Sequence, residues 1–134
     1  MENINNFVVP EIGVDVVDVE RMTFALERTP RIRQRLFTEA EIAYCEKYRF
    51  AERHYAGRWA AKEAVTKALG CGLIQWNGVE VLRKPRQAPT VRIFGKIEQF
   101  ASMVGVREDE ISISITHSEL SAVAVAIIRR KESS

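Results

Sequence analysis

Hydrophobic and polar residues alternate over several short stretches of this chain, and each stretch predicts a β-strand. Residues 12–19 are rich in valine and isoleucine, as strands commonly are. Residues 79–83 alternate, and residues 90–94 repeat the pattern after a turn that runs from Pro85 to Pro89. Three strands are therefore expected before residue 95.

Two further strands are expected near the C-terminus, and they differ in how apolar they are. In residues 111–116, isoleucines alternate with serine and threonine, which indicates a strand with one buried face. Residues 121–128 are almost wholly apolar, so this strand is expected to lie in the centre of its sheet.

Shorter helical segments are predicted in the first third of the chain. Residues 20–26 read as helix, and Pro30 breaks or restarts it. Thr38 is followed three residues later by Glu41, the pattern of a capping box, so a helix should run from there to about Tyr48.

The longest predicted helix covers residues 52–69, and Gly70 follows it in the position where a glycine commonly ends a helix. Residues 95–104 have apolar side chains at three- and four-residue steps, which predicts another helix. Helices come mainly first and strands mainly later. This order favours an α+β fold with an antiparallel sheet packed against the long helix.

The length of 134 residues suits one domain, residues 1–134, with residues 1–10 as a loose lead-in and 131–134 as a frayed tail. Cys45 and Cys71 have no metal-type or disulfide-framework spacing, so free thiols in a reducing compartment are expected. No segment is apolar enough to span a membrane, and the first residues lack signal-peptide features. A cytoplasmic location is the resulting prediction.

The formal net charge is only +2, so the total charge does not call for nucleic acid. The distribution is more informative, because five arginines stand against the single acid Glu27 between Arg21 and Arg35. That local field would attract an acidic partner.

The long helix carries an unusual cluster of charges: Arg58, Lys62, Glu63 and Lys67. Four-residue spacing places Arg58 with Lys62, and Glu63 with Lys67, on shared faces. Ordinary solvated ion pairing would explain this spacing in an isolated segment. The residues between are small or apolar, however, so the helix is expected to be buried, and buried charges need partners.

Asp15 lies within the first apolar strand, where a carboxylate points either to the polar face of an edge strand or into a site. A metal ion between Asp15 and Glu63 would satisfy both carboxylates. Mg²⁺ suits such a pair, because it keeps water ligands and takes others from substrate phosphates. Arg58, Lys62 and Lys67 would then supply positive charge to those phosphates.

Three blocks together resemble the holo-acyl-carrier-protein synthase family, the small class of 4′-phosphopantetheinyl transferases. They are residues 12–17, residues 58–70 and Ser114-Ile115-Thr116-His117-Ser118, in the family's order. Residues 88–91 are also similar to the family's turn and strand before its small helix. The resemblance covers roughly residues 11–129. Without it, His117 would read as a turn residue.

The resemblance implies transfer of 4′-phosphopantetheine from coenzyme A to a serine of an acyl carrier protein, with release of 3′,5′-adenosine diphosphate. It implies catalytic roles for Asp15, Glu63 and Lys67, with the two carboxylates as Mg²⁺ ligands and the lysine on the pyrophosphate. The coenzyme A pocket would be formed by Arg58, Lys62, Lys67, Gly70, His117 and Ser118. Family members are typically trimers with sites between subunits, so His117 could serve a neighbouring site.

Two further points concern the carrier protein and its serine. The first helix of the family binds the acidic recognition helix of the carrier protein, which assigns that role to Arg21, Arg28 and Arg31. The serine needs a base, and either a water held by Asp15 or Glu63 or a carboxylate itself could serve.

This chain departs from the family at residues 1–10, which have no clear counterpart, and after the long helix. Gly70-Cys71-Gly72 lacks the hydroxyl residue that often follows the glycine, and the connection from residue 73 to Gly78 is short. The competing interpretation is a non-catalytic basic module that binds an acidic protein and needs neither Asp15 nor Glu63. A small RNA-binding domain is disfavoured, because no strand interleaves basic and aromatic residues.

Overall fold

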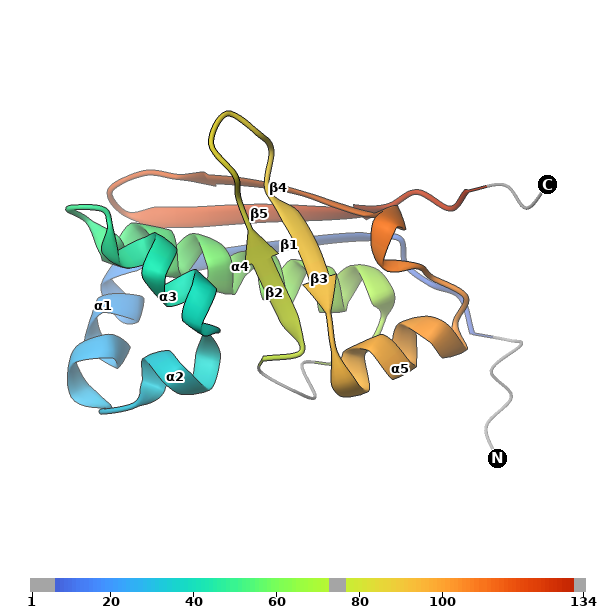
Figure 1. The fold of residues 1–134 in the computed structure, drawn as a ribbon, viewed down its shortest axis with the longest axis horizontal. Helices are drawn as coiled ribbons and strands as arrows, with labels where there is room; N and C mark the ends of the chain where they lie inside the picture. Colours follow the sequence, from blue (N-terminus) through green and yellow to red (C-terminus); the bar gives the residue numbers. More distant parts are fainter. Residues whose placement is uncertain (1–6, 73–76, 132–134) are drawn as a thin grey trace.

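The computed structural model describes residues 7–72 and 77–131 (Figure 1). Three strands form an antiparallel sheet: β1 (Ile12–Asp18), β4 (Ile111–His117) and β5 (Ser121–Ile128). Their order is β1-β5-β4, which confirms that the most apolar strand is central. Ala124 of β5 lies opposite Asp15 of β1 on one side and Ile115 of β4 on the other.

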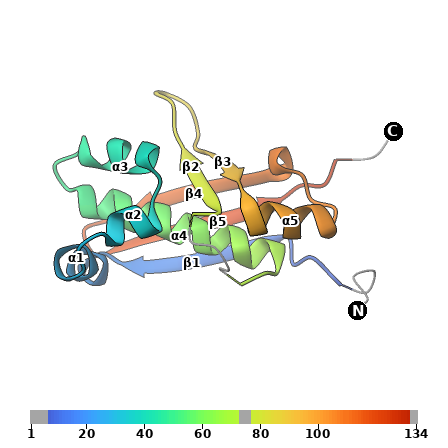
Figure 2. The ribbon, with the colours of Figure 1, turned by 60° about the horizontal axis from the view of Figure 1, so that its bottom comes forward.

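The long helix α4 (Ala51–Leu69) packs along one face of this sheet (Figures 1 and 2). Small side chains line the contact and allow a close approach. A side chain at Gly13 would place its Cβ 2.0 Å from the carbonyl oxygen of Ala64. The buried alanines of the contact are Ala60, Ala61, Ala64 and Ala68 from α4 and Ala122, Ala124 and Ala126 from β5. The expected α+β arrangement of an antiparallel sheet on a long helix is confirmed.

The other two strands do not join this sheet. β2 (Val79–Leu82) and β3 (Thr90–Ile93) pair with each other as a separate two-stranded hairpin. Helix α5 (Gly95–Met103) follows the hairpin, and a short 3₁₀ turn at Glu108–Glu110 leads into β4. Ile97 and Ala101 of α5 are buried in the same core as the small residues of α4.

Three short helices gather at the other end of the molecule (Figures 1 and 2): α1 (Val19–Arg28), α2 (Ile32–Leu36) and α3 (Glu39–Glu46). Asp18 caps α1 by accepting from the backbone N–H of Glu20 at 2.9 Å. The predicted capping box of Thr38 and Glu41 is present at the start of α3. Helix α2 follows Pro30, in agreement with the expectation that the proline either breaks the helix or restarts it.

Residues 7–10 are the part of the predicted lead-in that the structure describes. Val9 is buried in the main core. The backbone N–H of Glu11, the residue after the lead-in, donates to the carbonyl oxygen of Ala68 at 2.9 Å. Residues 1–6, the connection at 73–76 and the tail at 132–134 lie outside the described residues.

Candidate active site

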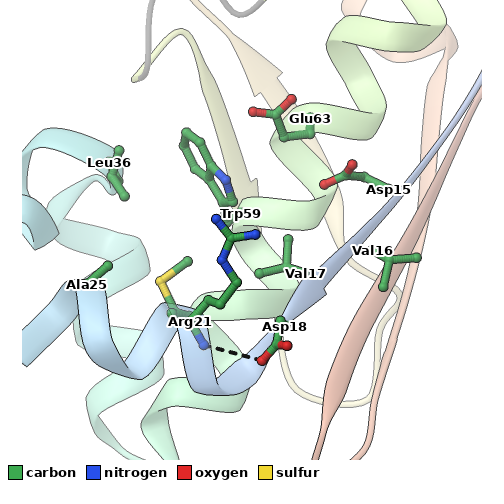
Figure 3. A pocket seen from close by; sticks show the side chains of 10 residues that line it. Asp15, Val16, Val17, Asp18, Arg21, Ala25, Leu36, Trp59 and Glu63 are labelled. Carbon is green, nitrogen blue, oxygen red and sulfur yellow. Dashed lines mark hydrogen bonds between the residues drawn. The ribbon is translucent and has the colours of Figure 1, made fainter.

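A cavity of about 360 Å³ opens between β1, α1, α2 and α4 (Figure 3). Asp15 enters it from β1 and Glu63 from α4, and their carboxylates lie on the same side of the cavity. Trp59 and Arg21 form the adjoining wall. The other lining residues are Val16, Val17, Asp18, Met22, Ala25 and Leu36. The cavity therefore combines a pair of acids with an apolar floor.

The alternation of β1 explains how Asp15 reaches this cavity. Gly13, Asp15 and Val17 point toward α4, whereas Val14 and Val16 are exposed on the opposite face of the sheet. The Asp15 side chain is only 18% exposed. Of the two sequence-based readings of Asp15, the structure thus favours a residue directed into a site.

Lys67 completes this group. Its Nζ donates to Oδ1 of Asp15 at 3.0 Å and to the carbonyl oxygen of Val14 at 3.2 Å. Partial burial, followed by the charge of Asp15, raises the pKa of Glu63, and Lys67 opposes the shift. Two carboxylates that share a partly buried site repel each other, and a divalent cation between them would relieve that repulsion.

The donors present fit a magnesium ion better than a transition metal. Among the side chains of residues 7–72 and 77–131, no group of three or more His, Cys, Asp and Glu is arranged to hold a metal ion. A pair of hard oxygen donors suits Mg²⁺, which retains water and accepts phosphate oxygens from a substrate. Asp15 and Glu63 are the residues that would hold it.

The three arginines predicted to bind a carrier protein lie on α1 and in the connection between α1 and α2. Arg21 borders the cavity, and Arg28 is exposed at the C-terminal end of α1. Arg31 is also exposed and adopts a left-handed backbone conformation, with φ of 72°, immediately before α2. An acidic surface that docks on α1 would thus meet positive charge next to the carboxylate pair.

Arg58 and His117 meet in a second, smaller cavity. Arg58 is 4% exposed, and its Nε and Nη2 atoms are buried without a hydrogen-bond partner among the described residues. Its guanidinium carbon lies 3.8 Å from the centre of the Tyr44 ring. A buried guanidinium with two unused donors is suited to an anionic ligand.

His54 also lines the second cavity, and the sequence analysis missed it. Its ring is 4.8 Å from that of His117 and is stacked on Tyr48 at 3.8 Å. Burial, followed by the charge of His117, lowers the pKa of His54 to about 4. His54 precedes Arg58 by four residues, so helical spacing from the charge cluster was a signal that could have identified it.

The expected role of Lys62 needs correction. Its side chain is fully buried, and its Nζ lies 2.8 Å from Oε1 of Glu41 and donates to the carbonyl oxygen of Val79. Burial lowers the pKa of Lys62, although the charge of Glu41 opposes this shift. A lysine held in this way inside the protein does not reach either cavity, so it is not placed to bind a phosphate.

Gly70 and Ser118 also lie outside the two cavities. Gly70 ends α4 in a left-handed conformation, with φ of 90°, and is covered by Phe7 and Pro10. The hydroxyl of Ser118 accepts from the backbone N–H groups of Leu120 and Ser121, both at 3.3 Å, in the β4–β5 turn. In this chain alone, the predicted coenzyme A residues are thus not brought together in one pocket.

The fold and the carboxylate pair on β1 and α4 now place the chain in a class. The family model of the 4′-phosphopantetheinyl transferase superfamily matches residues 11–125, and the chain belongs to this superfamily. It is 38% identical over 120 residues to the holo-[acyl-carrier-protein] synthase of Moorella thermoacetica, which covers 88% of this chain and 92% of that protein. The synthase of Alkaliphilus metalliredigens is 40% identical over 119 residues, or 87% of this chain and 95% of that protein.

Solved structures agree with this assignment. The holo-[acyl-carrier-protein] synthase of Neisseria meningitidis has a TM-score of 0.77 at 20% identity, over 92% of this chain and 100% of that chain, which supports the fold. The synthase of Bacillus anthracis, solved in complex with CoA (3′,5′-ADP), has a TM-score of 0.70 at 26% identity, over 89% of this chain and 95% of that chain. Within the described residues, no helix is long and apolar enough to cross a membrane.

Proposed function

We propose that this chain is a holo-acyl-carrier-protein synthase. It transfers the 4′-phosphopantetheine group of coenzyme A to a serine of an apo acyl carrier protein. The serine oxygen forms a bond to phosphorus, the bond to the pyrophosphate bridging oxygen breaks, and 3′,5′-adenosine diphosphate leaves. The observation that carries this proposal is the Asp15–Glu63 pair beside Lys67, in a cavity that opens next to Arg21.

The chain's residues contribute mainly position and charge to this reaction, as is general for phosphoryl transfer. Lys67 is half exposed beside Asp15, so its ammonium can turn from the carboxylate to an incoming pyrophosphate. A magnesium ion held by Asp15 and Glu63 would supply charge to offset the negative charge that develops on the phosphate oxygens.

The proton of the serine hydroxyl must leave as the new bond forms. We propose that a water held by Asp15 or Glu63 accepts it, because a carboxylate occupied by a metal ion is a poor base. Glu63 is the carboxylate with the raised pKa, and Asp15 is already paired with Lys67. A carboxylate as the direct base is the alternative.

Arg21, Arg28 and Arg31 are proposed to dock the acidic face of the carrier protein. Arg21 borders the cavity that contains the carboxylate pair, so a carrier bound along α1 would bring its serine toward Asp15 and Glu63. The charge of this region, and not a deep apolar groove, would dominate recognition.

The coenzyme A site is proposed to form between two copies of this chain in a homotrimer. The carboxylates and the Arg58–His117 group lie in separate cavities of one chain. The sheet face opposite α4 is apolar and exposed at Ile12, Val14, Val16 and Ile127. Association through this face would cover its apolar side chains, and a shared site would combine the cationic cavity of one subunit with the carboxylates of another.

Mixing two variants of reduced activity tests this shared site. Glu63→Gln removes a carboxylate, and Arg58→Ala removes the buried guanidinium. If one site uses residues from two chains, subunits exchanged between the two variants will restore part of the activity. If each chain contains its own complete site, the mixture will be no more active than the average of its two components.

The second candidate is a non-catalytic module that holds an acidic protein through the same arginines. It would require neither the carboxylate pair nor Lys67, so the grouping of these three residues favours the enzyme.

The free thiols of Cys45 and Cys71 fit a reducing compartment, and the cytoplasm remains the proposed location.

A further inference from the structure

Lys62 and Glu41 form a charged pair that is fully buried and that the proposed reaction does not use. Glu41 is engaged on every side: Oε1 accepts from the backbone N–H of Thr38 at 2.8 Å, and Oε2 accepts from that of Val81 at 2.8 Å. Lys62 in turn donates to the carbonyl oxygen of Val79. The pair therefore joins α3, α4 and β2 at a single point.

A second contact between the same two helices lies one turn away. Tyr44 follows Glu41 by three residues on α3, and Arg58 precedes Lys62 by four residues on α4, so each pair shares one helix face. The guanidinium of Arg58 lies on the ring of Tyr44, 3.8 Å from its centre. The two helices, running in opposite directions, are thus joined by two rungs: Glu41–Lys62 inside and Tyr44–Arg58 at the cavity wall.

The inner rung is suited to fixing the register of the two helices. A buried ion pair is weak evidence for added stability, because removing two charges from water offsets their attraction. Its geometry is nevertheless selective, since a shift of one helix along the other would leave both charges buried and unpaired. Register control is the best supported use of such pairs.

The outer rung contains Arg58, whose position depends on the register of α3 and α4. Arg58 has two buried donors without a partner in the described part of the chain, and it shares the cavity with His54 and His117. Its position depends on Tyr44, because the ring covers one face of the guanidinium. An error in the α3–α4 register would move that ring and with it the donors.

We propose that Glu41 and Lys62 are positioning residues for Arg58 and thereby set the affinity of the enzyme for coenzyme A. This inference rests on the proposed function, in which the cavity of Arg58 and His117 forms part of the coenzyme A site. In this inference, Lys62 acts inside the protein, where the structure places it, and does not contact coenzyme A.

The test is a double-mutant cycle between the two rungs. The double substitution Glu41→Gln with Lys62→Met removes both charges, so no uncompensated charge remains buried. The glutamine side chain keeps one oxygen that can accept from a backbone N–H. It is measured in the native background and in the Arg58→Ala background. Glu110→Gln is the control, because Glu110 is also buried and accepts from the backbone N–H groups of Arg107 and Lys131.

We expect the double substitution to raise the KM for coenzyme A about tenfold, with kcat and the KM for the carrier changed less than about twofold. In the Arg58→Ala background, the same substitution should add less than about twofold, because the positioned group is gone. The Glu110→Gln control should leave the KM for coenzyme A unchanged. Unfolding midpoints of all variants show that each is folded.

Two results would overturn the positioning role: an unchanged KM for coenzyme A in the double variant, or an equal increase with and without Arg58. An Arg58→Ala variant with native KM for coenzyme A would instead contradict the proposed role of Arg58 itself. The experiment therefore distinguishes a failure of the positioning role of Glu41 and Lys62 from a failure of the proposed coenzyme A site.

Discussion

Lys67 donates to Asp15 across 3.0 Å although 52 residues separate them in the chain. The contact exists because β1 lies along α4 and directs every second side chain at the helix. Without a metal ion, the lysine compensates one carboxylate of the pair and leaves Glu63 with the raised pKa. The same two residues thus connect the packing of the fold to the chemistry of the site.

The Glu63→Gln variant should lose activity by about 10²-fold or more while it remains folded, because it removes charge but little volume. In the metal-free protein, it should also raise the midpoint of thermal unfolding, since the raised pKa shows that the ionised form is disfavoured in the fold. Activity assays and thermal unfolding with and without Mg²⁺ measure both effects. Glu98→Gln, on the exposed surface of α5, is the matched control.

Mg²⁺ should stabilise the native protein and the control but not the Glu63→Gln variant. Equal stabilisation of all three proteins, or full turnover by the variant, would remove Glu63 from the proposed metal site.

The Arg21→Glu variant should bind the carrier protein about tenfold more weakly, whereas coenzyme A binding should change little. The loss arises because one charge of the docking surface reverses, so its size should decrease as the salt concentration increases. Titration of carrier and of coenzyme A, each at low and high salt, gives both affinities.

Arg92→Glu serves as the charge-matched control for Arg21→Glu, since Arg92 is exposed on β3. An equal loss of affinity for carrier and coenzyme A in the Arg21 variant would contradict the docking role.

Stability should depend on pH through His54. Its pKa in the fold is about 4, below the ordinary value of 6.5, so the unfolded chain binds the proton more readily. The contribution of neutral His54 to the free energy of unfolding is fully present above pH 6.5 and is lost as the pH falls toward 4. The free energy of unfolding of the native protein should therefore fall more steeply over this range than that of a His54→Phe variant. Parallel curves from denaturant titrations would refute this assignment.

Coenzyme A should bind more tightly as the pH falls through the same range, because an anion beside His54 and His117 favours their protonated forms. Calorimetry in buffers of different ionisation enthalpy reports the number of protons taken up on binding. Uptake that is unchanged in the His54→Phe variant would exclude His54 from the linkage.

Packing of β1 on α4 should depend on Gly13. A Cβ there would lie 2.0 Å from the carbonyl oxygen of Ala64, so Gly13→Ala should destabilise the protein by about 1–3 kcal/mol or more. Gly72→Ala is the control, since a Cβ at Gly72 meets nothing within 4 Å, and its effect should stay within about 0.5 kcal/mol. Urea unfolding compares the two. Similar stabilities would mean that the close approach is not required.

Local patterns in the sequence predicted most of the fold. The capping box at Thr38, the glycine at the end of α4 and the apolar character of β5 each have a local cause, and each is confirmed. The separation of the β2–β3 hairpin from the main sheet could not be predicted, because alternation shows that a strand has two faces but not which strand it joins.

The site was predictable where a charge stands in an apolar element. Asp15 in β1 stood out for this reason, and the structure brings it together with Glu63 and Lys67. Lys62 shows the limit of that reasoning. Residue type and spacing suggested a ligand, but its partner Glu41 lies on another helix, and only the tertiary structure reveals that the charge is already compensated.

The most direct test of the proposed reaction is mass spectrometry of an apo acyl carrier protein incubated with this protein, coenzyme A and Mg²⁺. The expected result is a mass gain of one phosphopantetheinyl group, lost when EDTA is added and lost with the Glu63→Gln variant. Tight binding of the carrier without any mass gain, across several carriers, would contradict the enzyme and favour the non-catalytic module.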